Sequence, residues 1–216
     1  MKDANRDMNS DKRRSLTQYS LVEELRHGKM VSNLAYWIGK ELGLEEDELH
    51  DLVVAGFFHD IGKMELDLES EQESDMPMIV EEMNSVRQHP LKGYDILKRH
   101  GYSDDICEAV LHHHENYDGS GYPDNLEGWN IPLPACILRV CDVFCALISD
   151  RPYRSAFPAK TAMEMMIEEI RKYDVKVFLA FQRSLHTDEG GDISIPEVAE
   201  EVRGVWRTIW NLKRNQ

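Results

Sequence analysis

Three segments of this sequence combine histidine or carboxylate side chains with apolar neighbours. The apolar run LVVAGFFHD ends in a His-Asp pair at 59–60, a His-His-Glu run stands at 113–115, and Asp142 lies inside the apolar segment ILRVCDVFCALI. A buried carboxylate costs free energy unless a cation or hydrogen-bond donors compensate it. A metal ion compensates such a charge directly, and imidazole together with carboxylate suits Fe, Mn, Zn or Co. The pattern therefore indicates a metal centre.

Each segment taken alone also has an ordinary explanation. A single histidine is more often a surface residue or a hydrogen-bonded core residue, and the dipeptide His-Asp is common by chance. The combination is harder to explain without a metal, because each buried titratable group would then need a partner of its own. We therefore favour a shared metal centre over a set of unrelated polar residues.

Two of these segments resemble the signatures of a known family. The segment HDIGK at 59–63 is similar to the signature of the HD superfamily of metal-dependent phosphohydrolases, and HHENYDGSGYP at 113–123 matches the HD-GYP signature HHExxDGxGYP at every fixed position. The similarity extends over roughly residues 19–183. The resemblance implies an all-α HD-domain bundle with an HD-GYP loop. It also implies a phosphodiesterase that uses a hydroxide held between metal ions to hydrolyse cyclic di-GMP to linear pGpG or GMP.

The family's metal ligands transfer to this chain where the residues match. The resemblance implies the ligands Glu23, His27, His59, Asp60, His89, His113, His114 and Asp142. This set suffices for two or three divalent ions, with Fe or Mn favoured and Zn, Ni, Co or Mg as alternatives. Asp60 is expected to bridge two ions and is therefore also a catalytic candidate. Glu23 and His27 share one face of a helix, although Glu23 and Glu24 also fit a solvated face.

Three further residues are expected to support the reaction beside the ligands. Lys63 is the second catalytic candidate, because its ammonium can stabilise charge that develops on phosphate oxygens; a solvated surface lysine is the alternative. Glu115 and Asp118 are expected to orient the ligand imidazoles or the loop that carries the GYP motif.

Three residues are expected to bind the substrate. The resemblance places the GYP loop beside the substrate, so Tyr122 is expected to contact a nucleotide, with a purely structural packed tyrosine as the alternative. Arg151 and Arg154 follow the segment that carries Asp142, and an arginine fork suits a second phosphate or a guanine. Ion pairs with nearby acids are the alternative for both arginines.

The chain also departs from the family pattern. Cys136 and Cys145 stand where the family usually has Arg and Asp, and residues 64–77 are strongly acidic where the family usually has an I-P-x-x-I-L stretch. An acidic rim weakens binding of an anionic dinucleotide at long range. Two alternatives therefore stay open: an HD phosphohydrolase that acts on another nucleotide, and a catalytically weak nucleotide-binding signalling module.

Helical periodicity dominates the chain, and no alternating strand pattern stands out. We expect helices over about 16–42, 46–62, 78–88, 90–100, 104–114, 134–149, 158–172 and 174–185, and a last helix that ends near residue 212. The glycine-rich stretch 115–132 is expected to be a structured loop. These elements predict a disordered tail at 1–15, one HD-GYP-like domain at 16–185, and a linker with an extra C-terminal helix at 186–216.

Composition limits the class of partner. The net charge of −15 disfavours a nucleic-acid partner, since it repels the phosphate backbone. No apolar run is long enough to enter a bilayer and the N-terminus has no signal-peptide pattern, so a cytoplasmic location is expected. The four cysteines lack zinc-finger spacing and are expected to be reduced core residues. The expected partners are a cyclic dinucleotide and, less directly, a second copy or a regulatory sensor.

Overall fold

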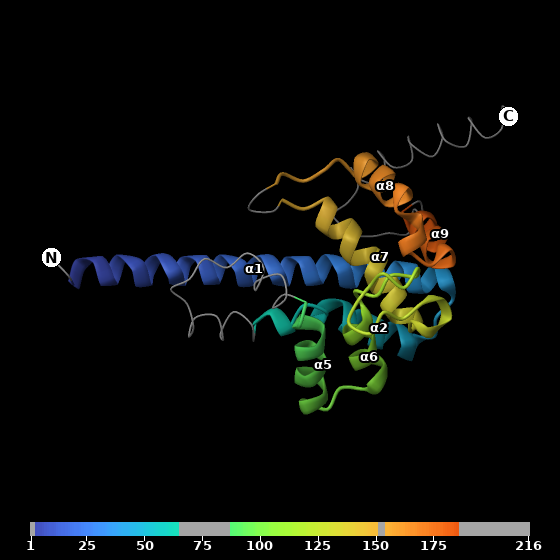
Figure 1. Ribbon diagram of the computed structural model, residues 1–216, viewed down its shortest axis with the longest axis horizontal. Coiled ribbons are helices and arrows are strands. Elements are labelled where there is room, and N and C mark those ends of the chain that lie inside the picture. Colours follow the sequence, from blue (N-terminus) through green and yellow to red (C-terminus); the bar gives the residue numbers. More distant parts are fainter. Residues whose placement is uncertain (1–2, 65–86, 151–153, 186–216) are drawn as a thin grey trace.

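The structure is a computed structural model that describes residues 3–64, 87–150 and 154–185, with side chains described from Val22 onward (Figure 1). Within these ranges the chain forms helices joined by loops, and an isolated β-bridge joins Asp118 to Glu127. The elements are α1 Asp3–Leu42, α2 Glu46–Phe58, α5 His89–Arg99, α6 Asp104–His112, η1 Gly128–Asn130, α7 Leu133–Leu147, α8 Ala159–Glu168, η2 Ile170–Lys172 and α9 Val175–Ser184.

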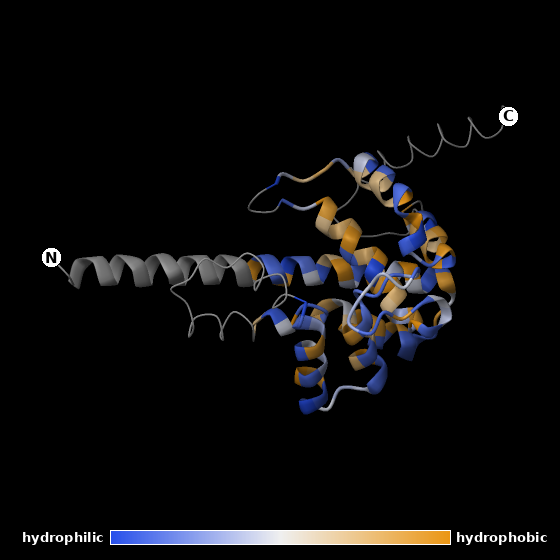
Figure 2. Ribbon diagram, viewed as in Figure 1, coloured by the Kyte–Doolittle hydropathy of each residue, from blue (hydrophilic) through white to orange (hydrophobic). Residues whose placement is uncertain are grey.

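The helix α7 lies at the centre of the bundle. It contacts α1, α6, α8 and α9, while α1 also packs against α2 and α9. Hydrophobic residues run along α7 and gather where the other helices meet it (Figure 2). Phe144 of α7 and Phe181 of α9 are fully buried, with ring centroids 4.9 Å apart. The expected all-α bundle is confirmed, and its core surrounds the helix that carries Asp142.

Helix boundaries differ from the expected ones at several places, and the helix expected over 158–172 is divided into α8 and η2. The helix α1 begins at Asp3, so residues 3–15 are helical rather than the expected disordered tail. No glycine or proline precedes Gly28, so no residue in this stretch breaks a helix. The helix α2 ends at Phe58 instead of continuing to about residue 62, and the chain turns through His59 and Asp60.

Other boundaries follow the expected local signals. The Ser103 hydroxyl caps α6 by accepting a hydrogen bond from the Ile106 amide, as its place before two acidic residues indicates. Asp174 caps α9 in the same way, accepting from the amides of Lys176 and Val177. Helix α6 ends at His112, slightly before the expected residue 114, and its last turn holds His113 against the backbone, as described below.

Several sequence expectations lie outside the described residues. These are the helix at 78–88, the acidic stretch beyond Met64, Arg151, and the linker and helix at 186–216. The four cysteines are buried, as expected of core residues. In the described part of the chain, no helix combines the length and apolar character that a membrane crossing needs.

Candidate metal centre

His59 stands directly after α2 with its ring fully buried. Its Nδ1 lies 2.8 Å from the Gly56 carbonyl oxygen, which can only accept, so Nδ1 carries the proton and donates. In the neutral ring the Nε2 atom presents a lone pair, and this atom is buried without a hydrogen-bond partner among the described residues. An orphaned imidazole nitrogen of this kind fits a metal ligand.

His113 follows the same rule at the end of α6. Its Nδ1 lies 2.6 Å from the Val110 carbonyl oxygen and donates to it. Its Nε2 then faces the Nε2 of His89, the first residue of α5, at 3.2 Å. At the ends of α2 and α6, each ring thus uses one nitrogen for the backbone and directs the other towards Asp60. A metal ion between the rings would use these lone pairs directly.

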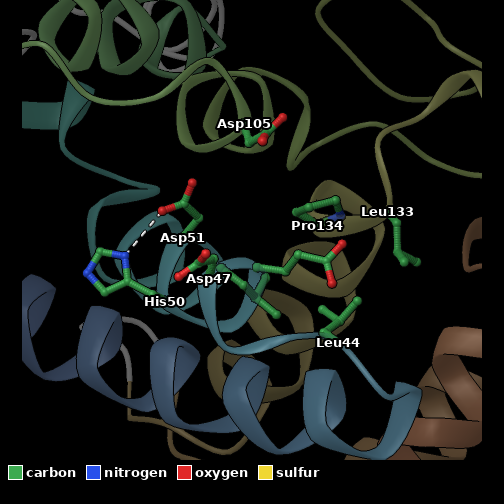
Figure 3. A pocket seen from close by; sticks show the side chains of 9 residues that line it. Leu44, Asp47, His50, Asp51, Asp105, Leu133 and Pro134 are labelled. Carbon is green, nitrogen blue, oxygen red and sulfur yellow. Dashed lines mark hydrogen bonds and ion pairs between the residues drawn. The ribbon is translucent and has the colours of Figure 1, made fainter.

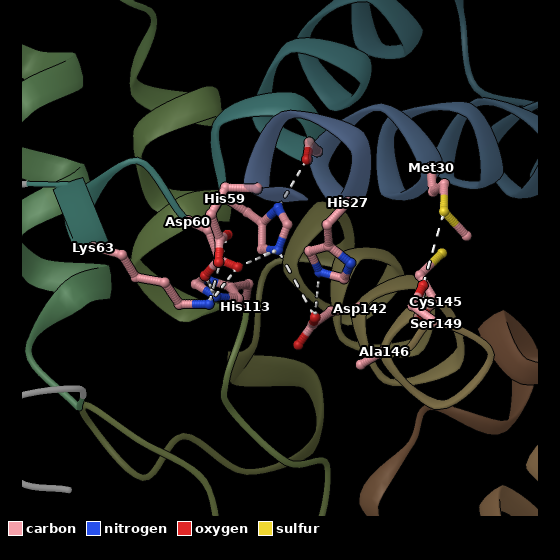
Figure 4. A network of polar contacts seen from close by, with 12 residues as sticks. His27, Met30, His59, Asp60, Lys63, His113, Asp142, Cys145, Ala146 and Ser149 are labelled. Atoms are coloured by element: carbon pink, nitrogen blue, oxygen red, sulfur yellow. Dashed lines mark hydrogen bonds and ion pairs between the residues drawn. The ribbon is translucent and has the colours of Figure 1, made fainter. Parts of the chain in front are cut away.

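Asp60 lies between two groups of histidines (Figure 4). Its Oδ1 atom is 3.2 Å from His89 Nε2 and 4.0 Å from His113 Nε2. Its Oδ2 atom is 3.3 Å from His59 Nε2 and 2.6 Å from Lys63 Nζ. One oxygen therefore faces each group, which is the arrangement expected of a carboxylate shared by two ions.

The ligand atoms form two groups that meet at Asp60. In each group the candidate ligand atoms lie within 4.8 Å of one another: His27, His59 and Asp60 make up one, and Asp60, His89, His113 and His114 the other. Asp142 extends the first group, because its Oδ1 lies 3.0 Å from His27 Nε2 and 3.8 Å from His59 Nε2. The donor set of imidazoles and carboxylates fits a pair of divalent ions.

The electrostatics of the centre favour added positive charge. Burial opposes ionisation of Asp60 and Asp142, but neighbouring histidines, and Lys63 in the case of Asp60, hold the pKa of both carboxyls well below the usual range. Burial lowers the pKa of His59, yet Asp60 and Asp142 outweigh it and raise the value to about 10. The two carboxylates therefore attract a cation at this point, whether a proton or a metal ion.

The second group of histidines is electrostatically different. Burial, together with neighbouring histidines, holds the pKa of His113 well below its usual value. Burial also lowers the pKa of His114 to about 3. Both rings are therefore neutral at neutral pH, which is the form that binds metal.

A close backbone approach brings Asp60 and His89 together. A Cβ atom on Gly62 would lie 2.0 Å from the His89 carbonyl oxygen and 2.7 Å from the Gly93 amide nitrogen. Only a residue without a side chain lets the turn after α2 lie against the first turn of α5. The glycine of HDIGK thus has a physical role in joining the two ligand groups.

Lys63 contacts the centre directly. Its Nζ lies 2.6 Å from Asp60 Oδ2 and 4.0 Å from Glu24 Oε2. Burial lowers the pKa of Lys63, but Asp60 and Glu24 outweigh this and raise it, so the side chain stays an ammonium. A solvated surface lysine is therefore not what the structure contains.

The structure brings Glu24, rather than Glu23, towards the centre. Glu23 is partly exposed and belongs to neither ligand group. Glu24 Oε2 is buried near Lys63 without a hydrogen-bond partner in the described ranges. Positions 23 and 24 precede His27 by four and three residues, so both are within reach of its helix face. The ligand role of Glu23 stays a prediction, with Glu24 as its competitor.

A pair of variants separates the two glutamates. We expect Glu24→Ala to lower the metal content by about one ion, because its buried oxygen is the one that lacks a partner. Glu23→Ala is the matched comparison, and an unchanged metal content in this variant would assign the ligand role to Glu24. Elemental analysis of protein purified without oxygen measures both. The opposite result would restore Glu23 as the ligand.

Glu115 and Asp118 form hydrogen bonds within the loop between α6 and α7. The buried carboxylate of Glu115 accepts hydrogen bonds from the amides of Asp124, at 2.7 Å, and Leu126, at 3.1 Å. The exposed Asp118 accepts from the amide and hydroxyl of Ser120. Of the two roles expected from the sequence, these hydrogen bonds support stabilisation of the loop rather than orientation of the ligand imidazoles.

Tyr122 packs directly on a candidate ligand. Its ring stacks on His114 with centroids 4.8 Å apart and an interplanar angle of 22°, and Arg87 lies 5.4 Å from the ring centroid. The stacking restricts the orientation of His114 and leaves part of the tyrosine accessible. Substrate contact by Tyr122 stays a prediction beside this packing role.

Arg154 closes the end of α7. Its guanidinium donates to the carbonyl oxygens of Ala146, Leu147 and Ser155, and it lies over the ring of Phe157. These contacts satisfy carbonyls that a helix end leaves without partners. They support a structural role, and the substrate-binding role expected of Arg154 stays a prediction.

A pocket of about 420 Å³ opens elsewhere, lined by α2, α6 and the start of α7 (Figure 3). Four carboxylates line it, those of Asp47, Glu48, Asp51 and Asp105. Such a lining repels an anionic phosphate. This pocket is therefore poorly suited to an anionic ligand.

Arg139 is a site residue that the sequence interpretation missed. It lies on α7 three residues before Asp142, and its Nε–H donates to Asn116 Oδ1 at 2.9 Å. The signal was present, because Arg139 is the other charged residue inside the apolar segment ILRVCDVFCALI that drew attention to Asp142.

Comparisons with known proteins agree with this geometry. The family model for the HD domain matches residues 4–177. The chain is 36% identical over 161 residues to the cyclic di-GMP phosphodiesterase response regulator RpfG of Xanthomonas campestris, covering 70% of this chain and 42% of that protein. It is 34% identical to the 3'3'-cGAMP-specific phosphodiesterase 1 of Vibrio cholerae, covering 71% of this chain and 36% of that protein. The chain thus spans less than half the length of these curated relatives.

Solved structures share the fold. One is Bd1817 of Bdellovibrio bacteriovorus, titled an HDG"Y"P protein, with a TM-score of 0.57, 18% identity, and coverage of 73% of this chain and 51% of that chain. Another is the cyclic GMP-AMP specific phosphodiesterase V-cGAP3 of V. cholerae, with a TM-score of 0.59, 17% identity, and coverage of 83% and 48%. From the family match over most of its length and from the signatures at 59–63 and 113–123, the chain belongs to the HD domain family, in its HD-GYP branch.

Proposed function

We propose that this chain is a metal-dependent phosphodiesterase that hydrolyses cyclic di-GMP to linear pGpG or to GMP. The observation that carries the proposal is Asp60, which directs one oxygen towards each of two groups of histidines. Such a shared carboxylate is the hallmark of sites that hold two ions a few ångström apart. Relatives whose names state cyclic di-GMP hydrolysis support the choice of substrate.

In this proposal each residue of the centre has a separate role. Bound divalent ions would supply an activated water and polarise a phosphate oxygen. Asp60 holds the two ligand groups together, and the neutral His113 and His114 offer lone pairs without competing protons. The ammonium of Lys63 lies beside Asp60 and can donate to a phosphate oxygen as charge develops there. Tyr122 keeps His114 in place by stacking.

The metal is proposed to be Fe or Mn. Mixed imidazole and carboxylate ligands suit these ions, and Zn, Ni, Co and Mg are the alternatives to be measured against them. Purification without oxygen followed by elemental analysis identifies the ion, because Fe(II) can be oxidised or lost in air.

A second candidate substrate is 3'3'-cGAMP, since a relative with 34% identity is named for that specificity. Both nucleotides carry two phosphodiesters, so the metal centre alone does not choose between them. The choice depends on contacts with the bases, which involve residues away from the ligands.

The test is turnover by metal-loaded protein of cyclic di-GMP and 3'3'-cGAMP, with products separated by chromatography. Preferred hydrolysis of cyclic di-GMP is the expected result. Preference for 3'3'-cGAMP would change the substrate but keep the chemistry. Binding of either nucleotide without turnover, in protein with a full metal content, would identify a catalytically silent signalling module and refute the proposal.

Location and partners belong to the same proposal. The net charge of −15 disfavours nucleic acid as a partner and makes local positive charge necessary for an anionic substrate. The cytoplasmic location and the homodimer or sensor partner expected from the sequence stay predictions.

A further inference from the structure

Arg139 is a partly buried arginine at the edge of the metal centre. It lies on α7 one turn before Asp142, and its Nε–H donates to Asn116 Oδ1 at 2.9 Å. Asn116 follows the ligand His114 by two residues, so this hydrogen bond ties α7 to the backbone that carries a ligand. The guanidinium therefore lies between the helix of Asp142 and the loop of His114.

The charge of Arg139 has no carboxylate partner in the described ranges. Its described hydrogen-bond partner, Asn116, is neutral and uses one of the five donors of the guanidinium. Removing a cation from water without a counter-ion costs free energy, so a partly buried arginine is usually paired. The two Nη groups make no hydrogen bond to the described residues and are available to an anion.

Other cations near the centre are already engaged. Lys63 is held by Asp60 at 2.6 Å, and Arg154 donates to three carbonyl oxygens at the end of α7. Arg87 is exposed and lies over the ring of Tyr122. Among these side chains, Arg139 combines partial burial with a guanidinium that keeps most of its donors available.

The electric field of Arg139 reaches the residues of the centre. Its charge adds to burial in lowering the pKa of His114, and it opposes the rise in the pKa of Tyr122 that burial causes. Both residues form the stacked pair that borders the second ligand group. An anion held by Arg139 would therefore lie next to the centre.

We propose that Arg139 binds the phosphate of the cyclic dinucleotide that is not being cut. This inference rests on the proposed function. The metal ions neutralise only the phosphate that they hold, and a chain with a net charge of −15 needs a separate local cation for the second one. An arginine fork binds a phosphodiester through two parallel hydrogen bonds, which makes Arg139 a residue that selects for a substrate with two phosphates.

The test compares two substrates with the variant Arg139→Gln. Glutamine can still donate to Asn116 but has no charge, so it keeps the loop contact and removes the proposed phosphate contact. The KM for cyclic di-GMP is expected to rise by about 10- to 100-fold, the range of one charge-assisted hydrogen bond. The KM for bis(p-nitrophenyl) phosphate, which has a single phosphodiester, is expected to change little.

A second readout does not depend on turnover. Calorimetry with metal-loaded protein measures the dissociation constant of linear pGpG, which should rise by a similar factor in Arg139→Gln. Arg183→Gln is the control, because it removes the same charge from α9, where Arg183 pairs with Glu41. If Arg139→Gln does not fold, Arg139→Lys keeps the charge without the fork and should give a smaller rise in the same two constants.

The outcomes separate this inference from the proposed function. Equal changes for both substrates, or a lost metal content, would show that Arg139 only supports the loop and would overturn the inference. An unchanged KM and an unchanged dissociation constant would overturn it as well. A wild-type protein that neither binds nor hydrolyses cyclic di-GMP would refute the proposed function itself, and this is measured before any variant is made.

Discussion

Asp60→Asn is expected to lose nearly all hydrolysis of cyclic di-GMP and part of its bound metal. Asparagine has the same shape but no charge, and it cannot offer one anionic oxygen to each group of histidines. Changing a residue that only orients a ligand costs about 10- to 100-fold in metal affinity or activity, so loss of a shared ligand should cost more than about 100-fold. Turnover rates and elemental analysis of the purified variant measure both effects.

Asp51→Asn is the matched control for this prediction. Asp51 is a partly exposed carboxylate of α2, the helix that leads into Asp60. It contacts Ser103 and His50, neither of which belongs to the two ligand groups. Its removal changes the net charge equally, and it should leave turnover and metal content as they are. Full turnover by Asp60→Asn with an unchanged metal content would contradict a shared carboxylate and, with it, the two-ion mechanism.

Part of the candidate centre could be expected from local patterns, because buried histidines and carboxylates require a partner. The apolar surroundings of the His59-Asp60 pair, His113 and Asp142 indicated such a need, whereas His27 and His89 were expected only from the family resemblance. His59 and His113 illustrate this, since each stands where an apolar helix ends and each donates Nδ1–H to a carbonyl oxygen one turn earlier. Such local rules are visible without knowledge of the fold.

The sequence did not predict which side chain faces the centre where two neighbouring residues could both reach it. Glu23 and Glu24 both lie within a turn of His27, and only the rotation of α1 against α2 decides which of them approaches Lys63. Arg154 was expected to bind the substrate, but its guanidinium donates hydrogen bonds to carbonyl oxygens of α7 because the chain folds back after that helix. These outcomes depend on packing between elements, which local patterns do not contain.

Gly121→Ala is expected to damage both the stability of the fold and the metal centre. A Cβ atom at this position would lie 2.3 Å from the Asn116 amide nitrogen and 2.4 Å from Glu115 Cα. These are backbone atoms and cannot rotate away, so the backbone beside His114 must move. Overpacking of this kind costs up to about 3 kcal/mol, which corresponds to a fall in Tm of roughly 6–12 °C for a chain of this size.

Gly101→Ala separates this packing effect from the general cost of replacing glycine. Gly101 has a φ of 79° and no atom within 4 Å of an added Cβ, so alanine there is strained only by its left-handed backbone. That strain costs about 1 kcal/mol, and metal content and turnover should be unchanged. In Gly121→Ala, by contrast, Glu115 is displaced and its hydrogen bonds to Asp124 and Leu126 weaken, which moves His114 away from its neighbours. Thermal unfolding and elemental analysis of both variants measure the difference; equal, small effects in the two would mean that the loop backbone has room at Gly121 and does not hold His114 in place.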